Sequence, residues 1–149
     1  MGIPVALGLA GGMGACMADP DNARSVRIAV EYRDREAVRA ALAAHPDGLE
    51  ERDEVGSTPL IIATGSGQFA IAELLIDAGA NVWALDRFGI NPAGNTATVK
   101  YPPGTPEGDA RERVVKRLRE RGVPFPPPPP REVLRLSKAG EWQQPHGGN

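Results

Sequence analysis

The chain has 149 residues and a mass of 15.8 kDa, which suits one domain of ordinary size. Its 17 Lys and Arg against 19 Asp and Glu leave a net charge of -2, so we expect no general attraction to nucleic acid. One cysteine and two histidines exclude an internal disulfide framework and a multi-cysteine zinc site. Aromatic residues make up 5%, whereas glycine and proline number 18 and 15, which favours packing of helices through small residues over a β-sandwich. We expect no metal and no cofactor.

The N-terminal segment is apolar and uncharged over residues 3–17. No stretch reaches the roughly 18 apolar residues needed to span a bilayer. Gly14-Ala15-Cys16 resembles the end of a bacterial lipoprotein signal with Cys16 as the acylated residue, although no Lys or Arg precedes the run. The alternative is a glycine-rich tail that is disordered or packs on the domain. Residues 1–20 are therefore placed outside the fold, and the location stays open between the cytoplasm and the cell envelope.

A pattern in the middle of the chain repeats after 33 residues. Residues 53–60, Asp-Glu-Val-Gly-Ser-Thr-Pro-Leu, recur in outline at residues 86–93, Asp-Arg-Phe-Gly-Ile-Asn-Pro-Ala. The window is similar to the ankyrin repeat, a 33-residue unit with a turn, two helices and a Thr-Pro-Leu-His signature. Ile61 departs from it, because the family usually has His there. The matching positions are Thr58, Pro59, Leu60, Ala63, Gly67, Ile71, Leu74, Leu75, Ala78, Gly79, Ala80, Asn81, Val82 and Ala84.

Local signals predict two helices in this unit. Thr58 can cap the first helix with its hydroxyl, and Pro59 suits the first helical position, where its missing N–H would have been unpaired. A second helix is predicted over residues 69–78, with apolar side chains on one face and Gly79 in the left-handed conformation that ends it. Because so small a unit cannot bury its own apolar face, it needs a neighbour on each side.

An upstream neighbour is predicted as helices over residues 25–33 and 35–44, with Asp34 as the cap between them. Its many charges are typical of a terminal unit that faces water. The downstream neighbour is irregular because three prolines interrupt it at positions 102, 103 and 106. It begins either at Asn91-Pro92 or at residues 94–97, and its second helix is predicted to start after Asp109.

Five prolines at residues 126–130 predict a stiff polyproline II segment. We interpret it as a spacer, with a ligand for an SH3-like groove as the alternative. A last helix over residues 131–139 is expected to fold back over the third unit, and residues 143–149 are expected to be disordered. The sequence thus predicts an all-α protein, in which residues 21–123 form a short ankyrin-repeat solenoid of about three helix pairs, the third irregular, and residues 124–149 follow with the strut and the C-terminal helix.

Charge is unevenly distributed along the chain. Residues 45–54 carry a local net charge of about -4, and residues 109–121 carry about +3. Two interpretations stay open. Either the acidic end attracts a basic partner and the basic helix meets nucleic acid or anionic lipid, or both are ordinary solvated faces. The aromatic residues that would accompany a nucleic-acid surface are absent from the basic stretch.

The ankyrin resemblance implies a protein-binding module without enzymatic activity, of the small bacterial kind, with an unidentified protein as its partner and a monomeric state. In that family the partner meets hairpin fingers and the exposed face of each first helix. The corresponding residues here are Glu54, Val55 and Ser57, then Arg87, Phe88 and Ile90, and Gly65 with Ser66 at the end of the first helix. Phe88 is the expected anchor, because an aromatic at a finger tip suits that role. The alternatives are a lipid-anchored bacterial envelope protein with the same module, and a regulatory subunit of an enzyme.

Overall fold

The computed structural model describes residues 25–143, and these residues form helices and no strand. The predictions for residues 1–20, including acylation of Cys16, lie outside the described residues, as does most of the predicted disordered tail. The domain limits at residues 20 and 123 stay predictions. The helices are α1 Val26–Glu31, α2 Arg35–Ala44, a 3-10 helix η3 Pro46–Glu50, α3 Pro59–Gly65, α4 Phe69–Asp77, α5 Pro92–Thr98, α6 Pro106–Glu120 and α7 Pro130–Lys138.

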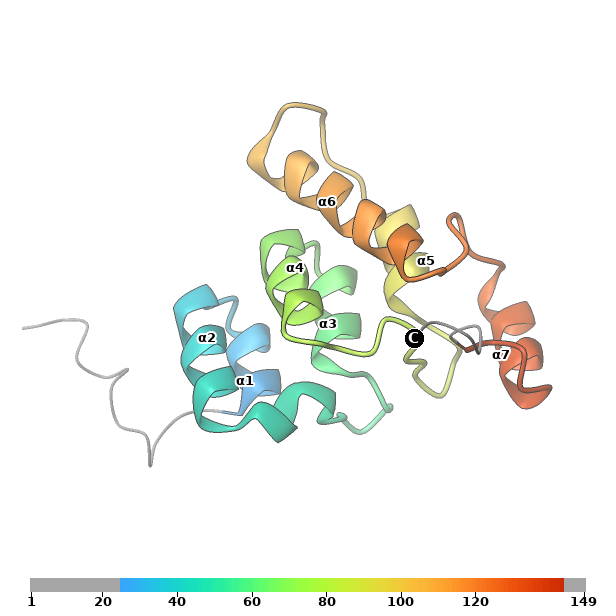
Figure 1. Ribbon diagram of the computed structural model, residues 1–149, viewed down its shortest axis with the longest axis horizontal. Helices are drawn as coiled ribbons and strands as arrows, with labels where there is room; N and C mark the ends of the chain where they lie inside the picture. The colour runs from blue at the N-terminus through green and yellow to red at the C-terminus, as the bar shows by residue number, and fades with distance from the viewer. Residues whose placement is uncertain (1–24, 144–149) are drawn as a thin grey trace, which may run out of the picture.

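Three antiparallel helix pairs lie side by side: α1 with α2, α3 with α4, and α5 with α6 (Figure 1). The first helices of the pairs pack on each other in the order α1, α3, α5, and α4 lies between α2 and α6. This arrangement confirms the predicted all-α array of about three units. Each pair is short, so its apolar face is buried only by the next pair.

The core runs through all three layers. Val30, Val38, Leu60, Leu75 and Leu118 are fully buried, and they come from α1, α2, α3, α4 and α6 respectively. The core residues of each unit therefore shield the apolar face of the neighbouring unit from water. Burial of this kind is the main favourable contribution to the stability of the stack.

The helices begin where short polar side chains cap them. In five of the α-helices the residue before the helix accepts a hydrogen bond from the backbone N–H three positions later, at 2.9 to 3.4 Å. These caps satisfy N–H groups that have no partner within the helix. The capping residues are Ser25, Asp34, Thr58, Asn91 and Thr105.

The third unit resolves one alternative and corrects one prediction. It begins at Asn91, whose Oδ1 caps α5, so the inserted residues lie between α5 and α6 rather than before α5. The cap of α6 is Thr105, not Asp109, and the helix starts four residues earlier than expected. Pro106 does not interrupt this helix, because proline fits the first turn where no N–H bond is lost.

The C-terminal segment returns to the loop that precedes the third unit. Residues 127–129 have no regular secondary structure, Pro129 is extended with φ -60 and ψ 155, and Pro130 is the first residue of α7. The backbone carbonyl of Pro130 and the side chain of Leu134 lie so close to Gly89 that a Cβ at that glycine would meet both. Trp142, after α7, packs edge to face on Trp83. The last helix thus folds back onto the loop that contains Trp83 and Gly89, whereas its packing over the third unit stays a prediction.

Candidate protein-binding surface

Two loops, the first finger at residues 51–57 and the second finger at residues 81–90, share one construction. In each finger an aspartate, Asp53 or Asp86, accepts through Oδ1 the backbone N–H groups two and four positions later, at 2.8 to 2.9 Å. A glycine follows three positions after each aspartate at φ +85 or +82, where a side chain would be strained. The 33-residue period therefore repeats the loop as well as the helices.

The two fingers are hydrogen-bonded to each other. The backbone N–H of Arg87 donates to the carbonyl of Val55 at 3.1 Å. Arg52 donates through Nη1 to the carbonyls of Gly56 and Leu85, at 2.5 and 2.7 Å. These bonds fix one finger against the next, so the two tips form a continuous edge, here called the finger edge.

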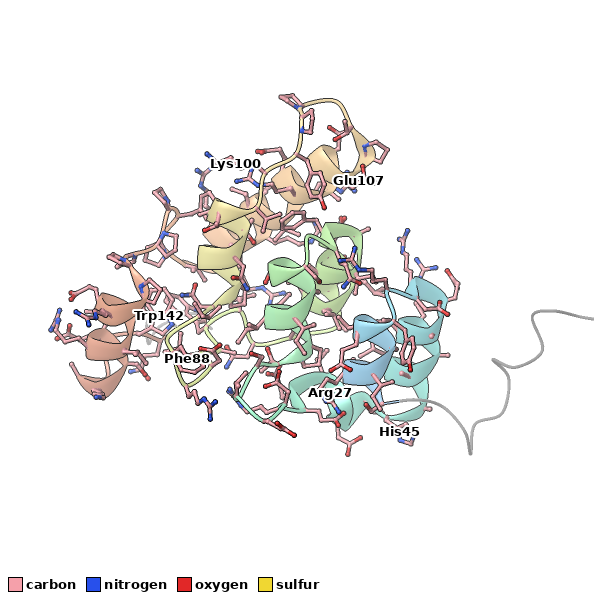
Figure 2. All side chains as sticks on the ribbon, turned by 180° about the vertical axis from the view of Figure 1, so that it is seen from behind. Arg27, His45, Phe88, Lys100, Glu107 and Trp142 are labelled. Atoms are coloured by element: carbon pink, nitrogen blue, oxygen red, sulfur yellow. The ribbon has the colours of Figure 1, made fainter. Side chains whose placement is uncertain are left out.

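Phe88 is the most prominent apolar residue of the finger edge. Its side chain is 55% exposed, and the Arg87 guanidinium lies 4.9 Å from the ring centroid (Figure 2). Its backbone N–H is bound by Asp86, so the aromatic ring stands on a rigid turn. Among the described residues, Tyr32 is the other large hydrophobic side chain with such exposure, and it lies at the end of α1.

The other predicted contact residues differ in accessibility. Glu54 and Gly65 are exposed, and Val55, Ser66 and Ile90 are partly buried. Ser57 is only 7% exposed, and its hydroxyl points to Asp86 at 3.5 Å. Ser57 therefore connects the two fingers, and little of it is accessible to a partner.

Gly65 and Ile90 lie together on the wall of a groove of about 410 Å³, here called the proline groove. Residues of α5 and the proline run 126–130 also line it. The polar side chains in it, from Asn91, Asn95 and Thr98, all serve backbone hydrogen bonds. The sequence indicated the prolines as a spacer or as a ligand for an SH3-like groove, because no local signal relates them to Gly65.

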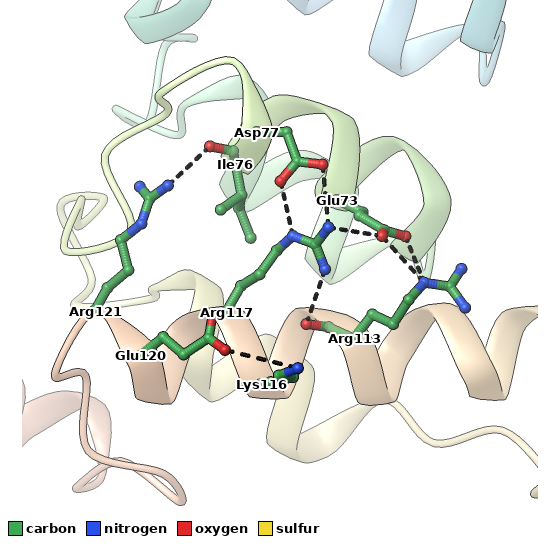
Figure 3. Close-up of polar contacts among 8 residues, drawn as sticks. All are labelled: Glu73, Ile76, Asp77, Arg113, Lys116, Arg117, Glu120 and Arg121. Carbon is green, nitrogen blue, oxygen red and sulfur yellow. Dashed lines mark hydrogen bonds and ion pairs between the residues drawn. The ribbon is translucent and has the colours of Figure 1, made fainter.

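The basic residues of α6 form ion pairs and hydrogen bonds with other parts of the protein. Arg113 and Arg117 form ion pairs of 2.9 Å with Glu73, and Arg117 also binds Asp77 at 2.7 Å (Figure 3). The hydrogen bond from Arg117 is the main reason that the pKa of the Asp77 carboxyl is lowered from 3.8, and Arg117 itself has a raised pKa for the same reason. Arg121 donates to the carbonyl of Ile76 at 3.2 Å. These arginines join α6 to α4, a role that neither interpretation of the basic stretch included.

Within residues 25–143, no cluster of three or more His, Cys, Asp and Glu is placed to hold a metal ion. None of the helices in that range is both long and apolar enough to cross a membrane.

Comparisons with known proteins agree with the geometry. The family model for the ankyrin repeat matches residues 55–87, which include the end of the first finger, α3, α4 and most of the second finger. Over 64 residues the chain is 45% identical to potassium channel KOR1 from Oryza sativa subsp. japonica. The matched region covers 43% of this chain and 7% of the channel. No solved structure matches the chain.

Proposed function

We propose that the finger edge and the proline groove bind a segment of another protein, because residues 55–87 match the family model for the ankyrin repeat. Ankyrin repeats are protein–protein interaction modules, and the residues proposed to meet the partner here are Glu54, Val55, Gly65, Arg87, Phe88 and Ile90. Ser57 and Ser66 support this surface through hydrogen bonds within the fold.

The observation that carries this proposal is the exposed ring of Phe88. Exposing an aromatic ring to water is unfavourable for the isolated chain, and burial of that ring against a partner would be favourable. The turn that holds Phe88 is fixed by Asp86, so little conformational freedom would be lost on binding. Rigid aromatic residues flanked by arginine are typical anchors in protein interfaces.

We assign no catalytic residue to the groove, since its polar side chains are all engaged in the fold. Anchoring of the module to a membrane through Cys16 stays a prediction, because that residue lies outside the described range. A role as a regulatory subunit of an enzyme would use the same surface, with an enzyme as the partner.

The test compares three forms of the full chain as baits in cell extract: wild type, Phe88→Ala and Tyr32→Ala. We expect wild type and Tyr32→Ala to retain the same protein, and Phe88→Ala to lose it by about tenfold or more, since an aromatic hot spot contributes over 1.4 kcal/mol. Equal melting temperatures would show that all three are folded. A partner that Phe88→Ala retains as well as wild type would contradict the proposed surface.

A further inference from the structure

The end of the helix stack opposite the fingers contains a separate pocket of about 420 Å³. The turns between paired helices meet there with the loop that joins α5 to α6. Figure 2 shows Glu107, on the rim of this pocket, far from Phe88 at the finger edge. The lining residues used below are Arg33, Arg35, Ala70, Tyr101, Pro106 and Glu107.

Arg33 occupies a backbone conformation that suits glycine. Its φ is +58, and among the described residues it is the only residue other than glycine with positive φ. In the next unit the corresponding position, just before the second helix, is Gly67 at φ +74. A Cβ makes this conformation unfavourable, so glycine would serve the fold better than arginine. Backbone strain of this kind is often found at functional sites.

The guanidinium of Arg33 makes little stabilising contact within the fold. Its Nη2 donates to the carbonyl of Ser66 at 3.3 Å, on the exposed surface, which is a long and weak contact. The Arg35 guanidinium has no hydrogen bond or ion pair to any part of the described chain. Glu107 is the acidic residue in the lining, so the pocket has a net positive charge. Two guanidinium groups with free donors are suited to a carboxylate.

The pocket also offers an apolar surface. Its accessible apolar residues are Ala70, Pro106 and the partly buried Tyr101. The Tyr101 ring is held in place, because it meets the buried ring of Phe69 edge to face with centroids 5.9 Å apart and its hydroxyl donates to the carbonyl of Gly67 at 3.1 Å.

We propose that this pocket binds the C-terminal residue of a partner peptide. The carboxylate pairs with Arg33 and Arg35, and the apolar side chain covers Tyr101, Ala70 and Pro106. A C-terminal residue carries an anion and an apolar group on the same carbon atom, which matches the two features of the pocket. This site is independent of the finger edge.

The test is a pair of tripeptides, acetyl-Gly-Gly-Leu with a free C-terminal carboxylate and the same peptide as its amide. Each is titrated into the full, ¹⁵N-labelled chain and followed by NMR. We expect the acid to bind with a Kd of about 1 mM or tighter, with shifts at Gly67, Gln68 and Phe69, and the amide to bind about tenfold more weakly. Equal binding of acid and amide, or no shift at those residues with either peptide, would overturn the proposal.

Arg33→Gly separates binding from folding. The variant removes the guanidinium and places glycine at a φ that suits it, so we expect an equal or higher melting temperature and about tenfold weaker binding of the acid peptide. Arg39→Ala is the matched control, because Arg39 pairs with Glu36 on α2 and does not line the pocket. Glu107→Gln should tighten binding, and Phe88→Ala should leave it unchanged. If Arg33→Gly bound the acid peptide as tightly as wild type, the assignment would be wrong.

Discussion

Trp142 donates its indole Nε1–H to the backbone carbonyl of Trp83, 59 residues earlier in the chain, over 3.1 Å. The two indole rings meet edge to face, with centroids 5.2 Å apart, and Trp142 is only 7% exposed. The end of the C-terminal segment is therefore attached to the second finger. This contact keeps α7 on the repeats and the proline run beside α5.

We expect Trp142→Ala to lower the free energy of unfolding by about 3 kcal/mol, because it removes a buried aromatic pair and a hydrogen bond together. Urea unfolding monitored by circular dichroism measures the change. Lys138→Ala, at an exposed position of α7, is the control and should stay within about 0.5 kcal/mol of wild type. Equal stability of the two variants would mean that α7 does not depend on the tryptophan contact.

Gly89 and Gly79 both have positive φ, at +82 and +99, but they differ in their surroundings. A Cβ at Gly89 would lie 2.5 Å from the carbonyl oxygen of Pro130, whereas nothing lies within 4 Å of one at Gly79. Both alanine variants should lose about 1 kcal/mol for the backbone conformation. We expect Gly89→Ala to lose about 1–3 kcal/mol more, because α7 must move. Thermal unfolding of the pair gives the comparison, and equal losses would contradict the close contact.

The start of α6 can be tested with two alanine substitutions. Thr105 Oγ1 accepts the backbone N–H of Gly108 at 3.1 Å, whereas Asp109 lies inside the helix. We expect Thr105→Ala to cost about 1 kcal/mol as the loss of an N-cap. Asp109→Ala should cost only about 0.3–0.5 kcal/mol, from its charge near the helix N-terminus. If urea unfolding showed a larger loss of stability for Asp109→Ala than for Thr105→Ala, Asp109 would be the cap.

The contact of Asp77 with Arg117 should make stability depend on pH. The pKa of Asp77 is lowered in the folded state from 3.8, so its contribution is complete above that value and is lost as the pH falls through the lower, folded pKa. Because the Asp77 side chain is 54% exposed, the contribution is about 0.5 kcal/mol.

The measurement is the stability difference between wild type and Asp77→Asn at pH 7 and at about pH 2.5, below the ordinary pKa of an aspartate carboxyl. We expect the difference to shrink towards zero at the lower pH. Glu54→Gln, at an exposed residue of the first finger, serves as the control for removing a surface charge. A difference for Asp77→Asn that stays constant with pH would mean that the ion pair does not stabilise the fold.

Features that depend on residues close together in the chain could be predicted from the sequence. The 33-residue period, Thr58 before Pro59, and the apolar spacing of residues 69–78 each act within a few neighbouring positions, and they correctly predict the helix pairs and their order. The resemblance that these residues carry also located the exposed aromatic at Phe88. The start of the third unit stayed open, because Asn91-Pro92 and residues 94–97 both offer acceptable local signals for a helix.

Contacts between distant segments were decided only by the tertiary structure. Nothing near Trp142 in the sequence indicates Trp83, and nothing near the proline run indicates Gly65. Arg33 likewise reaches the carbonyl of Ser66 only because successive units stack. Such contacts depend on how the chain returns on itself, and on which faces the stacked helices leave open, so no local pattern encodes them.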